Sequence, residues 1–236
     1  MRGSISIVIP IFNEEEILEE RIDFLIKELR KDFQNIEVIL SENGSTDNTK
    51  EIARKIASNC DEVSALTDDE IADYGQALID GVNASRYDEI AILELDYLDI
   101  DFLKRGYELL SIYDLIIGSK KISPSIDQRG WKRKLFTGLY NFLLKQAFHL
   151  KFTETHGLKM LKKSRLNSII NSCVTRHSVL PSELVIRASR DCSLKVCEIS
   201  LSLPLIEIRE TRINAIKRLK KTIEDLYLLK KVLSNE

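Results

Sequence analysis

The sequence is short of cysteine and glycine, and each shortage excludes a class of protein. Its 236 residues include four cysteines, which form no CxxC pair, and no group of histidines and cysteines has the spacing of a zinc site. Reduced structural thiols, as in a cytosolic protein, are therefore expected. The chain has nine glycines; no GxGxxG follows the first predicted strand and no GxxxxGKS/T occurs. These absences argue against a dinucleotide-binding Rossmann site and a P-loop NTPase.

Long apolar runs and a surplus of one charge are also missing. The apolar segment Ile5–Ile9 is too short for a signal peptide and ends at Pro10, and no stretch approaches the length of a transmembrane helix. The 35 basic and 37 acidic residues leave a net charge of −2, so the composition does not favour a nucleic-acid partner. We expect a cytoplasmic protein with one large domain, residues 1–210, followed by a short tail, residues 211–236.

Residues Ile90–Asp96, with the sequence IAILELD, form the most informative segment. An apolar run without polar alternation is typical of a strand covered on both faces, as in a parallel α/β sheet. The run ends on two carboxylates, Glu94 and Asp96, and ligands of such sheets bind beyond the carboxyl ends of the strands. Mg²⁺ is usually held by one or two carboxylates together with substrate phosphates. The pair therefore predicts a metal–diphosphate site, with helix capping or plain solvation as the alternative.

Strands and helices are predicted to alternate along the first half of the chain. Apolar runs predict strands at residues 4–9, 36–40, 62–66, 90–96 and 114–119, and helices are expected near residues 49–57, 75–85 and 101–111. Another helix is expected after Asn13, with Glu16 completing a capping box. This alternation predicts βαβ units, and hence an α/β fold with a mostly parallel sheet and helices on both faces.

Polar side chains follow three of the predicted strands. They are Asn13 and Glu14 after the first strand, Glu42, Asn43, Ser45 and Asp47 after the second, and Glu94 and Asp96 after the central one. The aromatic residue Phe12 lies beside Asn13 and Glu14. Because the carboxyl ends of parallel strands meet at one edge of a sheet, these residues are expected to converge there. The edge is acidic and poor in glycine, so bound phosphates would be neutralised through a metal and not by a glycine-rich loop.

The ordered set of these motifs resembles family 2 glycosyltransferases with the GT-A fold. PIFNEEE (Pro10–Glu16) resembles the family's PxYNE, and ENGSTDNT (Glu42–Thr49) resembles its DDGSxDGT. YGQALIDG (Tyr74–Gly81) resembles KGAALxxG, and LELDYLD (Leu93–Asp99) lies where the family has its DxD segment. Four more segments resemble polyprenyl-phosphate sugar synthases of the dolichol-phosphate mannose synthase type: GSKK (Gly118–Lys121), WKRKLFTGLYNFL (Trp131–Leu143), HGLKML (His156–Leu161) and SELVIRA (Ser182–Ala188). The resemblance implies a Rossmann-like GT-A domain over nearly the whole chain.

The resemblance also implies an activity, a cofactor and a set of site residues. It implies an inverting transfer of a sugar from a GDP- or UDP-sugar to a polyprenyl phosphate, with Mg²⁺ or Mn²⁺ as the cofactor. The residues that match the family's motifs are Pro10, Phe12, Glu14, Asn43 and Asp47 for the nucleotide, Glu94 and Asp96 for the metal, and Lys120, Arg133 and Thr137 for the acceptor phosphate. Arg133 and Thr137 are four residues apart and so would share one helix face, where a guanidinium group and a hydroxyl suit a phosphate.

The sequence departs from the family pattern at several of these positions. Asn43, Glu94, Leu98 and Lys120 stand where the family has aspartate, aspartate, a polar residue and arginine. The family also has an aspartate near residues 153–157, and an ungapped match places Thr153 there, with Glu154 one position away. These changes leave two alternatives open. One is a glycan hydroxyl as acceptor, with Glu154 or Glu183 as general base; the other is a non-catalytic protein that binds a nucleotide sugar or a partner.

The tail contains an amphipathic and strongly basic segment, residues 213–233. Apolar residues recur on one helical face and lysines flank it, which predicts a C-terminal helix. Such a helix suits the surface of an anionic membrane, where a polyprenyl acceptor would be embedded. Packing against the large domain or a partner subunit is the alternative. We therefore expect a cytoplasmic protein that attaches peripherally to the membrane.

Overall fold

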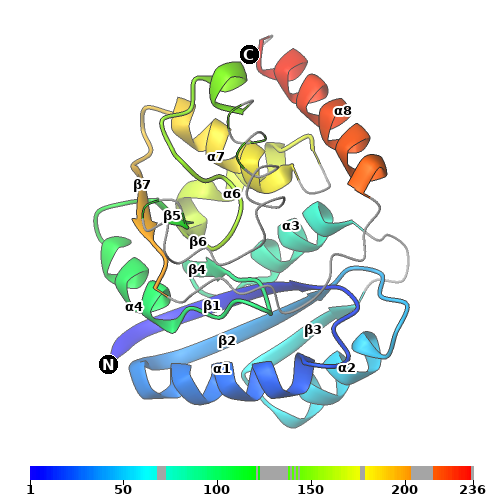
Figure 1. The fold of residues 1–236 in the computed structure, drawn as a ribbon. Helices are drawn as coiled ribbons and strands as arrows, with labels where there is room; N and C mark the ends of the chain where they lie inside the picture. The colour runs from blue at the N-terminus through cyan, green and yellow to red at the C-terminus, as the bar shows by residue number, and fades with distance from the viewer. Residues whose placement is uncertain are drawn as a thin grey trace.

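The computed structural model describes residues 1–67, 73–120, 122, 138, 140, 142, 144–175, 179–202 and 224–234, and the backbone of residues 215–223. Figure 1 shows one sheet with helices packed around it. The strands are β1 (Arg2–Ile11), β2 (Phe33–Glu42), β3 (Val63–Thr67), β4 (Glu89–Ile92), β5 (Leu115–Ser119), β6 (Lys159–Lys162) and β7 (Val196–Ser200). The helices are α1 (Leu18–Asp32), α2 (Thr49–Asn59), α3 (Tyr74–Ala84), α4 (Ile100–Leu109), α6 (Lys163–Ser172), α7 (Leu180–Arg190) and α8 (Ala215–Leu233).

The strands form a seven-stranded sheet in the order β3-β2-β1-β4-β6-β5-β7. All neighbouring pairs are parallel except those of β6, which runs antiparallel to both β4 and β5. The mostly parallel sheet predicted from the sequence is thus confirmed. The antiparallel strand β6 was not predicted, and it lies between β4 and β5.

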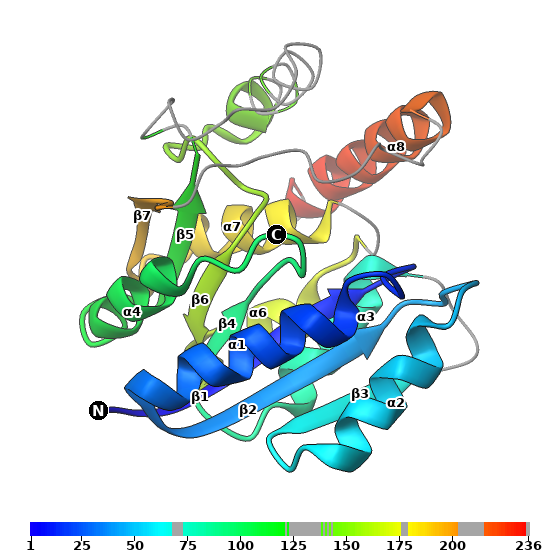
Figure 2. The ribbon, with the colours of Figure 1, turned by 60° about the horizontal axis from the view of Figure 1, so that its bottom comes forward.

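Helices cover both faces of the sheet, as predicted (Figure 2). Successive residues of β1 point to opposite sides, so Ile7 and Ile9 join one hydrophobic core whereas Val8 joins the other. The first core also takes the apolar faces of α1, α2 and α4, and the second takes those of α3, α6, α7 and α8. The strands are therefore covered on both sides, which explains their near-continuous apolar sequences.

The first strand is longer than predicted because it continues through Pro10. Proline cannot donate a backbone hydrogen bond and normally ends a central strand. In this sheet, however, β1 pairs with β4 at residues 6–8, and beyond them it pairs with β2, where Pro10 lies opposite Ser41. The missing N–H of Pro10 therefore lies past the segment where β1 has two paired neighbours, and the strand runs on to Ile11.

The predicted capping box at the start of α1 is wrong. The helix begins at Leu18, after Ile17, and no side chain caps it. Asn13 instead has a positive φ of 53° and accepts a hydrogen bond at Oδ1 from the backbone N–H of Thr46 (2.8 Å). An asparagine tolerates this left-handed conformation better than most residues, and here its side chain joins two loops in place of capping a helix.

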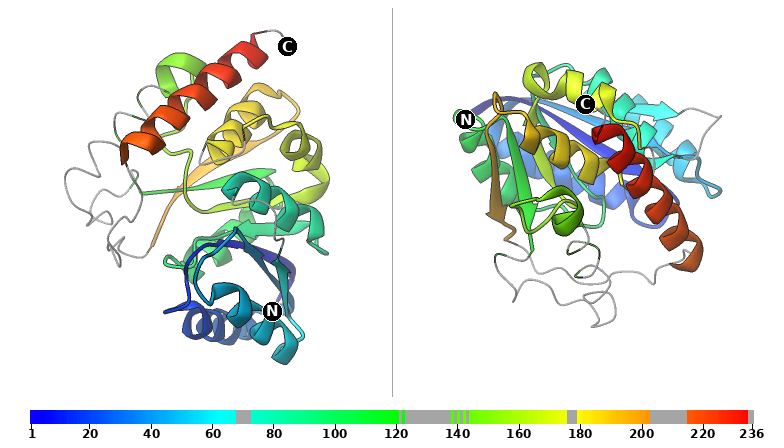
Figure 3. Two further views of the ribbon diagram at one scale, coloured as in Figure 1. Left: turned by 90° about the vertical axis from the view of Figure 1, so that its right-hand side faces the viewer. Right: turned by 90° about the horizontal axis from the view of Figure 1, so that it is seen from above.

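The C-terminal helix α8 packs on the second core beside α7 (Figures 1 and 3). Leu229 and Leu233 are buried, and Arg190 of α7 donates a hydrogen bond to the carbonyl oxygen of Leu233 (3.1 Å). On the outer side, Tyr227 and Leu228 are exposed together with two lysines. In the part of the chain that the structure describes, no helix combines the length and the apolar character needed to cross a bilayer.

Candidate active site

The loops that follow β1 and β2 are tied together at the carboxyl edge of the sheet. The backbone N–H of Asn13 donates to Ser45 Oγ (3.0 Å), and that of Glu14 donates to Thr49 Oγ1 (2.6 Å). With the bond that the backbone N–H of Thr46 donates to Asn13, these contacts fix the first loop against the start of α2. The structure therefore brings together the two loops whose residues were predicted to hold a nucleotide.

Two side chains in these loops offer groups to a ligand. The ring of Phe12 is 42% exposed, so an aromatic face is open to stacking. Asn43 Oδ1 is buried and, among the described residues, accepts no hydrogen bond. Its neighbour Gly44 has a φ of 72°, a conformation that glycine adopts at little cost. A buried acceptor without a donor is costly, and an N–H group of a bound base would satisfy it.

Other residues assigned to the nucleotide take structural positions in the same loops. Asp47 Oδ1 accepts hydrogen bonds from the backbone N–H (3.0 Å) and Oγ1 (2.5 Å) of Thr49 at the start of α2. Burial would raise the pKa of Asp47, but the hydrogen bonds from Thr49 outweigh it and lower that pKa below its ordinary value. Pro10 lies in β1, opposite Ser41. Contact of Asp47 and Pro10 with a nucleotide stays a prediction.

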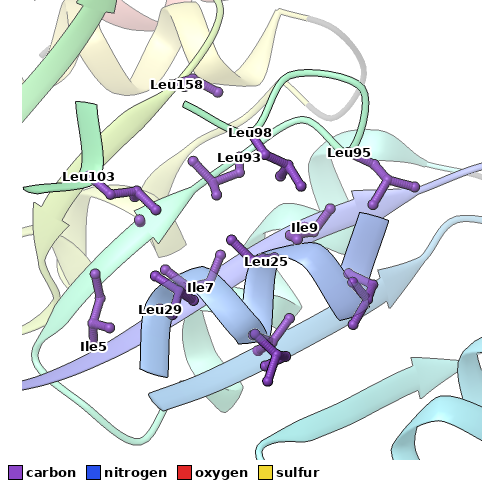
Figure 4. Packing of buried hydrophobic residues seen from close by; sticks show 14 of the residues in the cluster. Ile5, Ile7, Ile9, Leu25, Leu29, Leu93, Leu95, Leu98, Leu103 and Leu158 are labelled. Carbon is purple, nitrogen blue, oxygen red and sulfur yellow. The ribbon is translucent and has the colours of Figure 1, made fainter. Parts of the chain in front are cut away.

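The central strand is shorter than predicted. It ends at Ile92, and the chain then turns, with the backbone N–H of Tyr97 donating to the carbonyl oxygen of Glu94 (2.9 Å). Leu93, Leu95 and Leu98 are buried and point into the core between β1 and α1 (Figure 4). The two carboxylates that alternate with these leucines remain exposed. The turn, and not the strand itself, thus presents the predicted metal ligands.

Two polar contacts hold this turn in place. Arg21 of α1 donates from Nε to the carbonyl oxygen of Leu95 (3.1 Å) and from Nη2 to that of Asp96 (3.3 Å). At the other end, the buried carboxylate of Asp99 accepts from the backbone N–H groups of Phe102 (2.9 Å) and Ser202 (2.6 Å), so it caps α4. Asp99 is therefore a structural carboxylate and is separate from the candidate metal pair.

The electrostatics of Glu94 fit a cation site. Solvent reaches its side chain, yet enough protein surrounds the carboxyl group for desolvation to raise its pKa, and the nearby carboxylate of Asp96 raises it further. A divalent cation would offset both effects. Among the described residues no group of three or more histidine, cysteine or acidic side chains is arranged to hold a metal. The remaining ligands would come from substrate phosphates and water, as is usual for Mg²⁺.

A second group of charges lies beyond β5. Lys120 Nζ is 3.6 Å from Glu154 Oε2, and the two side chains are 12% and 1% exposed. The other oxygen of Glu154 accepts from the backbone N–H groups of Thr155 and His156, both at 3.2 Å. Oε2 accepts no hydrogen bond within the described part of the chain. Arg133 and Thr137, predicted to join Lys120 at an acceptor phosphate, lie outside the described residues.

Thr153 and Glu154 contact different parts of the structure. Thr153 donates from its backbone N–H (2.9 Å) and from Oγ1 (2.6 Å) to the carboxylate of Glu198 on β7, and its Oγ1 also contacts Ser119 Oγ (2.9 Å). These bonds direct the side chain of Thr153 toward β7, the outermost strand of the sheet. Glu154 is thereby the residue of this loop whose carboxylate faces Lys120.

Glu183, the other candidate general base, has a structural position. Its buried carboxylate accepts hydrogen bonds from the backbone N–H groups of Val174 (2.9 Å) and Thr175 (2.7 Å), and from Arg187 Nε (2.7 Å). It therefore fixes the segment after α6 against α7. Its neighbour Ser182 contacts His156 Nδ1 (3.1 Å), which ties the loop that carries Glu154 to α7.

Sequence reasoning missed one charged residue of this region, Lys159 on β6. It is 1% exposed, and its Nζ donates to the carbonyl oxygen of Gly157 (3.0 Å). Burial lowers its pKa to about 8, an effect that the carboxylates of Glu154 and Glu94 partly offset. A lysine flanked by Leu158 and Met160 was the available signal, because a charged residue inside an apolar run is rarely buried without a specific partner.

The chain is similar in sequence to known glycosyltransferases. Residues 6–170 match the family model described as Glycosyl transferase family 2. Glycosyltransferase AglD of Haloferax volcanii is 24% identical over 192 residues, covering 79% of this chain and 31% of that protein. Undecaprenyl-phosphate 4-deoxy-4-formamido-L-arabinose transferase of Proteus mirabilis is 26% identical over 155 residues, covering 61% of this chain and 44% of that protein. The chain thus spans less than half the length of either relative.

The fold is also that of solved structures. Glucosyl-3-phosphoglycerate synthase from Mycobacterium tuberculosis, in complex with Mn²⁺, UDP and phosphoglyceric acid, matches with a TM-score of 0.63 and 19% identity, covering 94% of this chain and 78% of that chain. The same enzyme in complex with Mg²⁺ and UDP matches with a TM-score of 0.65. At this identity the likeness shows the fold alone, and it confirms the GT-A architecture expected from the sequence.

Proposed function

This chain belongs to glycosyl transferase family 2, and on that premise we propose that it catalyses an inverting, metal-dependent transfer of a sugar from a UDP- or GDP-sugar to a polyprenyl phosphate. One observation carries the proposal: at one edge of the sheet, Glu94 lies close enough to the carboxylate of Asp96 and to the ammonium group of Lys120 to be influenced electrostatically by both. Two carboxylates suit a metal-bound diphosphate. A lysine beside them suits a second anionic group.

The donor would bind in the loops after β1 and β2. Phe12 and Glu14 would contact the base and ribose, and Asn43 Oδ1 would accept a hydrogen bond from an N–H group of the base. Pro10 and Asp47 would border the same pocket. The solved neighbour is described as a complex with UDP, which supports a nucleotide-diphospho-sugar donor.

Glu94 and Asp96 would hold Mg²⁺ or Mn²⁺ against the diphosphate. Complexes of the solved neighbour with Mn²⁺ or Mg²⁺ support this cofactor. When bound, the metal supplies Lewis-acid stabilisation of the charge that develops on the leaving diphosphate. The chain's own contribution is to hold the turn that carries the two carboxylates, through the buried Leu93 and Leu95 and the clamp from Arg21.

The acceptor phosphate would lie against Lys120, and the resemblance assigns Arg133 and Thr137 to the same group. A phosphate monoester is already anionic near neutral pH, so its oxygen needs no strong general base. That oxygen would form a bond to the anomeric carbon as the bond from this carbon to the diphosphate breaks, with inversion of configuration. The name of the Proteus mirabilis relative includes an undecaprenyl phosphate, which supports this acceptor class.

A hydroxyl acceptor is the second candidate, and Glu154 is the observation that favours it. Two backbone N–H groups orient the carboxylate through Oε1, while Oε2 has no hydrogen-bond donor among the described residues. A fixed carboxylate with one oxygen that accepts no hydrogen bond is suited to take the proton of an attacking hydroxyl. In that case Glu154→Gln should lower the rate of transfer by about 10²–10⁴-fold, the usual contribution of a general base.

A panel of donors and acceptors tests the proposal. UDP- and GDP-sugars would be incubated with Mn²⁺ or Mg²⁺ and either undecaprenyl phosphate or a soluble glycan, and the glycosylated acceptor would be measured. We expect transfer to the lipid phosphate that EDTA abolishes and that Glu154→Gln lowers by less than about tenfold, because no proton must be removed. Transfer to the glycan alone, with the loss in Glu154→Gln described above, would replace the first candidate by the second.

We also propose that the protein attaches peripherally to the cytoplasmic face of a membrane through residues 213–233. The buried face of α8 faces the domain, so the contact would use the outer face, where Tyr227, Leu228, Lys230 and Lys231 are exposed. An aromatic ring and an apolar side chain beside lysines suit an anionic lipid surface. Sedimentation with phosphatidylglycerol vesicles, and its loss in a Tyr227→Ser and Leu228→Ser double variant, would test this attachment.

A further inference from the structure

Lys159 is a charged residue inside the sheet. It lies on β6 opposite Ile92 of β4 and Ile117 of β5, and both of these neighbours belong to the second hydrophobic core. Its side chain is 1% exposed. Transfer of an ammonium group from water to such surroundings is unfavourable, which is why the pKa of Lys159 is lowered to about 8. A lysine that costs stability at its position is better explained by function than by packing.

The contacts of Lys159 point to the loop that carries Glu154. Its Nζ donates to the carbonyl oxygen of Gly157 (3.0 Å), a residue with a φ of 86°. Beyond it, the backbone N–H of Gly118 donates to the carbonyl oxygen of Leu158 (2.9 Å). The other end of the loop is held by the bonds from Thr153 to β7 described above. The loop is thus fixed at both ends, and Glu154 lies between the two anchors.

Two carboxylates and a second ammonium group act electrostatically on Lys159. Glu154 and Glu94 both attract the ammonium group of Lys159, and Lys120 repels it. If Lys159 were neutral, Lys120 would be the one cation of this group facing two carboxylates, and Glu94 would compete with Glu154 for it. With Lys159 present, each carboxylate has a nearby cation, and Lys120 stays directed at Glu154.

We propose that Lys159 is a positioning residue for sugar transfer: it holds the Gly157 end of the loop and balances the carboxylates, so that Glu154 and Lys120 keep the arrangement in which they meet the acceptor. This inference rests on the proposed function, for either class of acceptor. Lys159 would not touch the donor or the metal. It would act through Glu154, and this dependence is what an experiment can isolate.

Transfer kinetics test the effect on function. Lys159→Met removes the charged end of the side chain and keeps its unbranched apolar part. Lys162→Met, at a half-buried lysine on the same strand, is the matched control. We expect kcat of Lys159→Met to fall by about the same factor as that of Glu154→Gln with the same acceptor, while its Kd for UDP with Mn²⁺ stays within about twofold of the wild type, the pattern of a group that acts after donor binding. Lys162→Met should behave as the wild type. Unchanged kcat in Lys159→Met, or a loss of donor affinity as large as the loss of kcat, would overturn the proposal.

An unfolding cycle tests the dependence on Glu154 without any turnover. Removing a buried charge by an apolar residue is often neutral or stabilising, so Lys159→Met should raise the urea midpoint. The increase in the urea midpoint should be larger in a Glu154→Gln background. Only in the wild-type background does Lys159→Met also remove the attraction between Lys159 and Glu154. Equal shifts in the two backgrounds would overturn the proposal. If the wild type processed no nucleotide sugar at all, the proposed function would fail, and this cycle alone would decide the role of Lys159.

Discussion

Lys120 Nζ and Glu154 Oε2 lie 3.6 Å apart at the carboxyl edge of the sheet, and both side chains are largely shielded from solvent. The resemblance implies that Lys120 binds an acceptor phosphate, whereas Glu154 is one of the two candidate general bases for a hydroxyl acceptor. The structure places them against one another, so both chemistries would take place at one point. A phosphate acceptor would compete with Glu154 for the lysine, whereas a hydroxyl acceptor would give its proton to Oε2, the carboxylate oxygen that faces Lys120.

Replacing Asp96 should separate metal-dependent from metal-independent binding. Asp96→Ala removes one of the two proposed carboxylate ligands, so the gain in UDP or GDP affinity on adding Mn²⁺ should fall by at least about tenfold, or about 1.4 kcal/mol. Isothermal titration calorimetry with and without Mn²⁺ would measure it. Glu19→Gln, an exposed acid on α1, is the control. Equal stimulation by Mn²⁺ in Asp96→Ala and the wild type would place the metal elsewhere.

The affinity for Mn²⁺ should depend on pH in a direction set by Glu94. Its pKa is raised above the ordinary 4.5, first by desolvation and then by Asp96. Metal binding requires the ionised form, so protons compete at a higher pH than for an exposed glutamate. Mn²⁺ affinity should therefore begin to fall, as the pH is lowered, while the pH is still above 4.5. A Glu94→Gln variant should bind Mn²⁺ more weakly and lose this pH dependence.

Removing the amide of Asn43 should weaken nucleotide binding independently of the metal. The buried Oδ1 of Asn43 has no hydrogen-bond donor among the described residues, so a ligand N–H would satisfy it. Asn43→Ala should lower the affinity for the free nucleotide by about 0.5–1.5 kcal/mol, the net value of one hydrogen bond. The loss should be equal with and without Mn²⁺, in contrast to Asp96→Ala. Affinity equal to that of the wild type would exclude Asn43 from the base pocket.

Several features of the fold and site follow from the sequence alone. The strands at residues 36–40, 62–66 and 114–119 correspond to β2, β3 and β5, because apolar runs bounded by polar turns have few other stable arrangements in an α/β protein. The same regularity placed the polar loops at one edge of the sheet. The capping box at Asn13 failed for a physical reason: a tertiary hydrogen bond to Thr46 took the side chain that a local rule assigned to the helix.

Other features depend on contacts between distant segments. Strand β6 pairs with β4 although about 70 residues separate Ile90 from Leu161, and its sequence KMLK gives no clear strand pattern. The position of Glu154 depends on the hydrogen bonds that Thr153 donates to Glu198. These bonds join distant parts of the chain, so motif spacing does not predict them. Lys159 was missed because a lysine is expected at the surface, and its burial becomes visible only once β6 is placed between β4 and β5.

Arg133 should affect the acceptor and not the donor. If the guanidinium group binds the acceptor phosphate, its removal should cost about 2–3 kcal/mol, as for a charge-assisted hydrogen bond. Arg133→Ala should then lower kcat/KM for undecaprenyl phosphate by about one to two decades, at about 1.4 kcal/mol per decade. The Kd for UDP with Mn²⁺ should not change. Equal losses for donor and acceptor would assign Arg133 to the diphosphate, and no loss would favour the hydroxyl acceptor.

The buried Lys159 should give the protein's stability a characteristic pH dependence. Its pKa is about 8 in the folded protein and 10.5 in the absence of the fold. Below pH 8 both states bind the proton, and the unfavourable burial of the charge is fully present. Between the two pKa values the unfolded state binds more protons, so the free energy of unfolding rises with pH. Above the pKa of the unfolded state, Lys159 is neutral in both states, and burying its side chain no longer lowers the stability.

A variant without this lysine should lack that rise. The wild type should gain about 2 kcal/mol of stability relative to Lys159→Met between about pH 7 and pH 10, because lowering a pKa by one unit corresponds to about 1.36 kcal/mol. Urea unfolding in EDTA at several pH values would measure the difference in unfolding free energy between the wild type and Lys159→Met. Groups that titrate in the same way in both proteins do not contribute to this difference. Lys162→Met should run parallel to the wild type. If Lys159→Met also ran parallel to it, the ammonium group would be hydrated in solution, and it could not act as a buried counter-charge to Glu154.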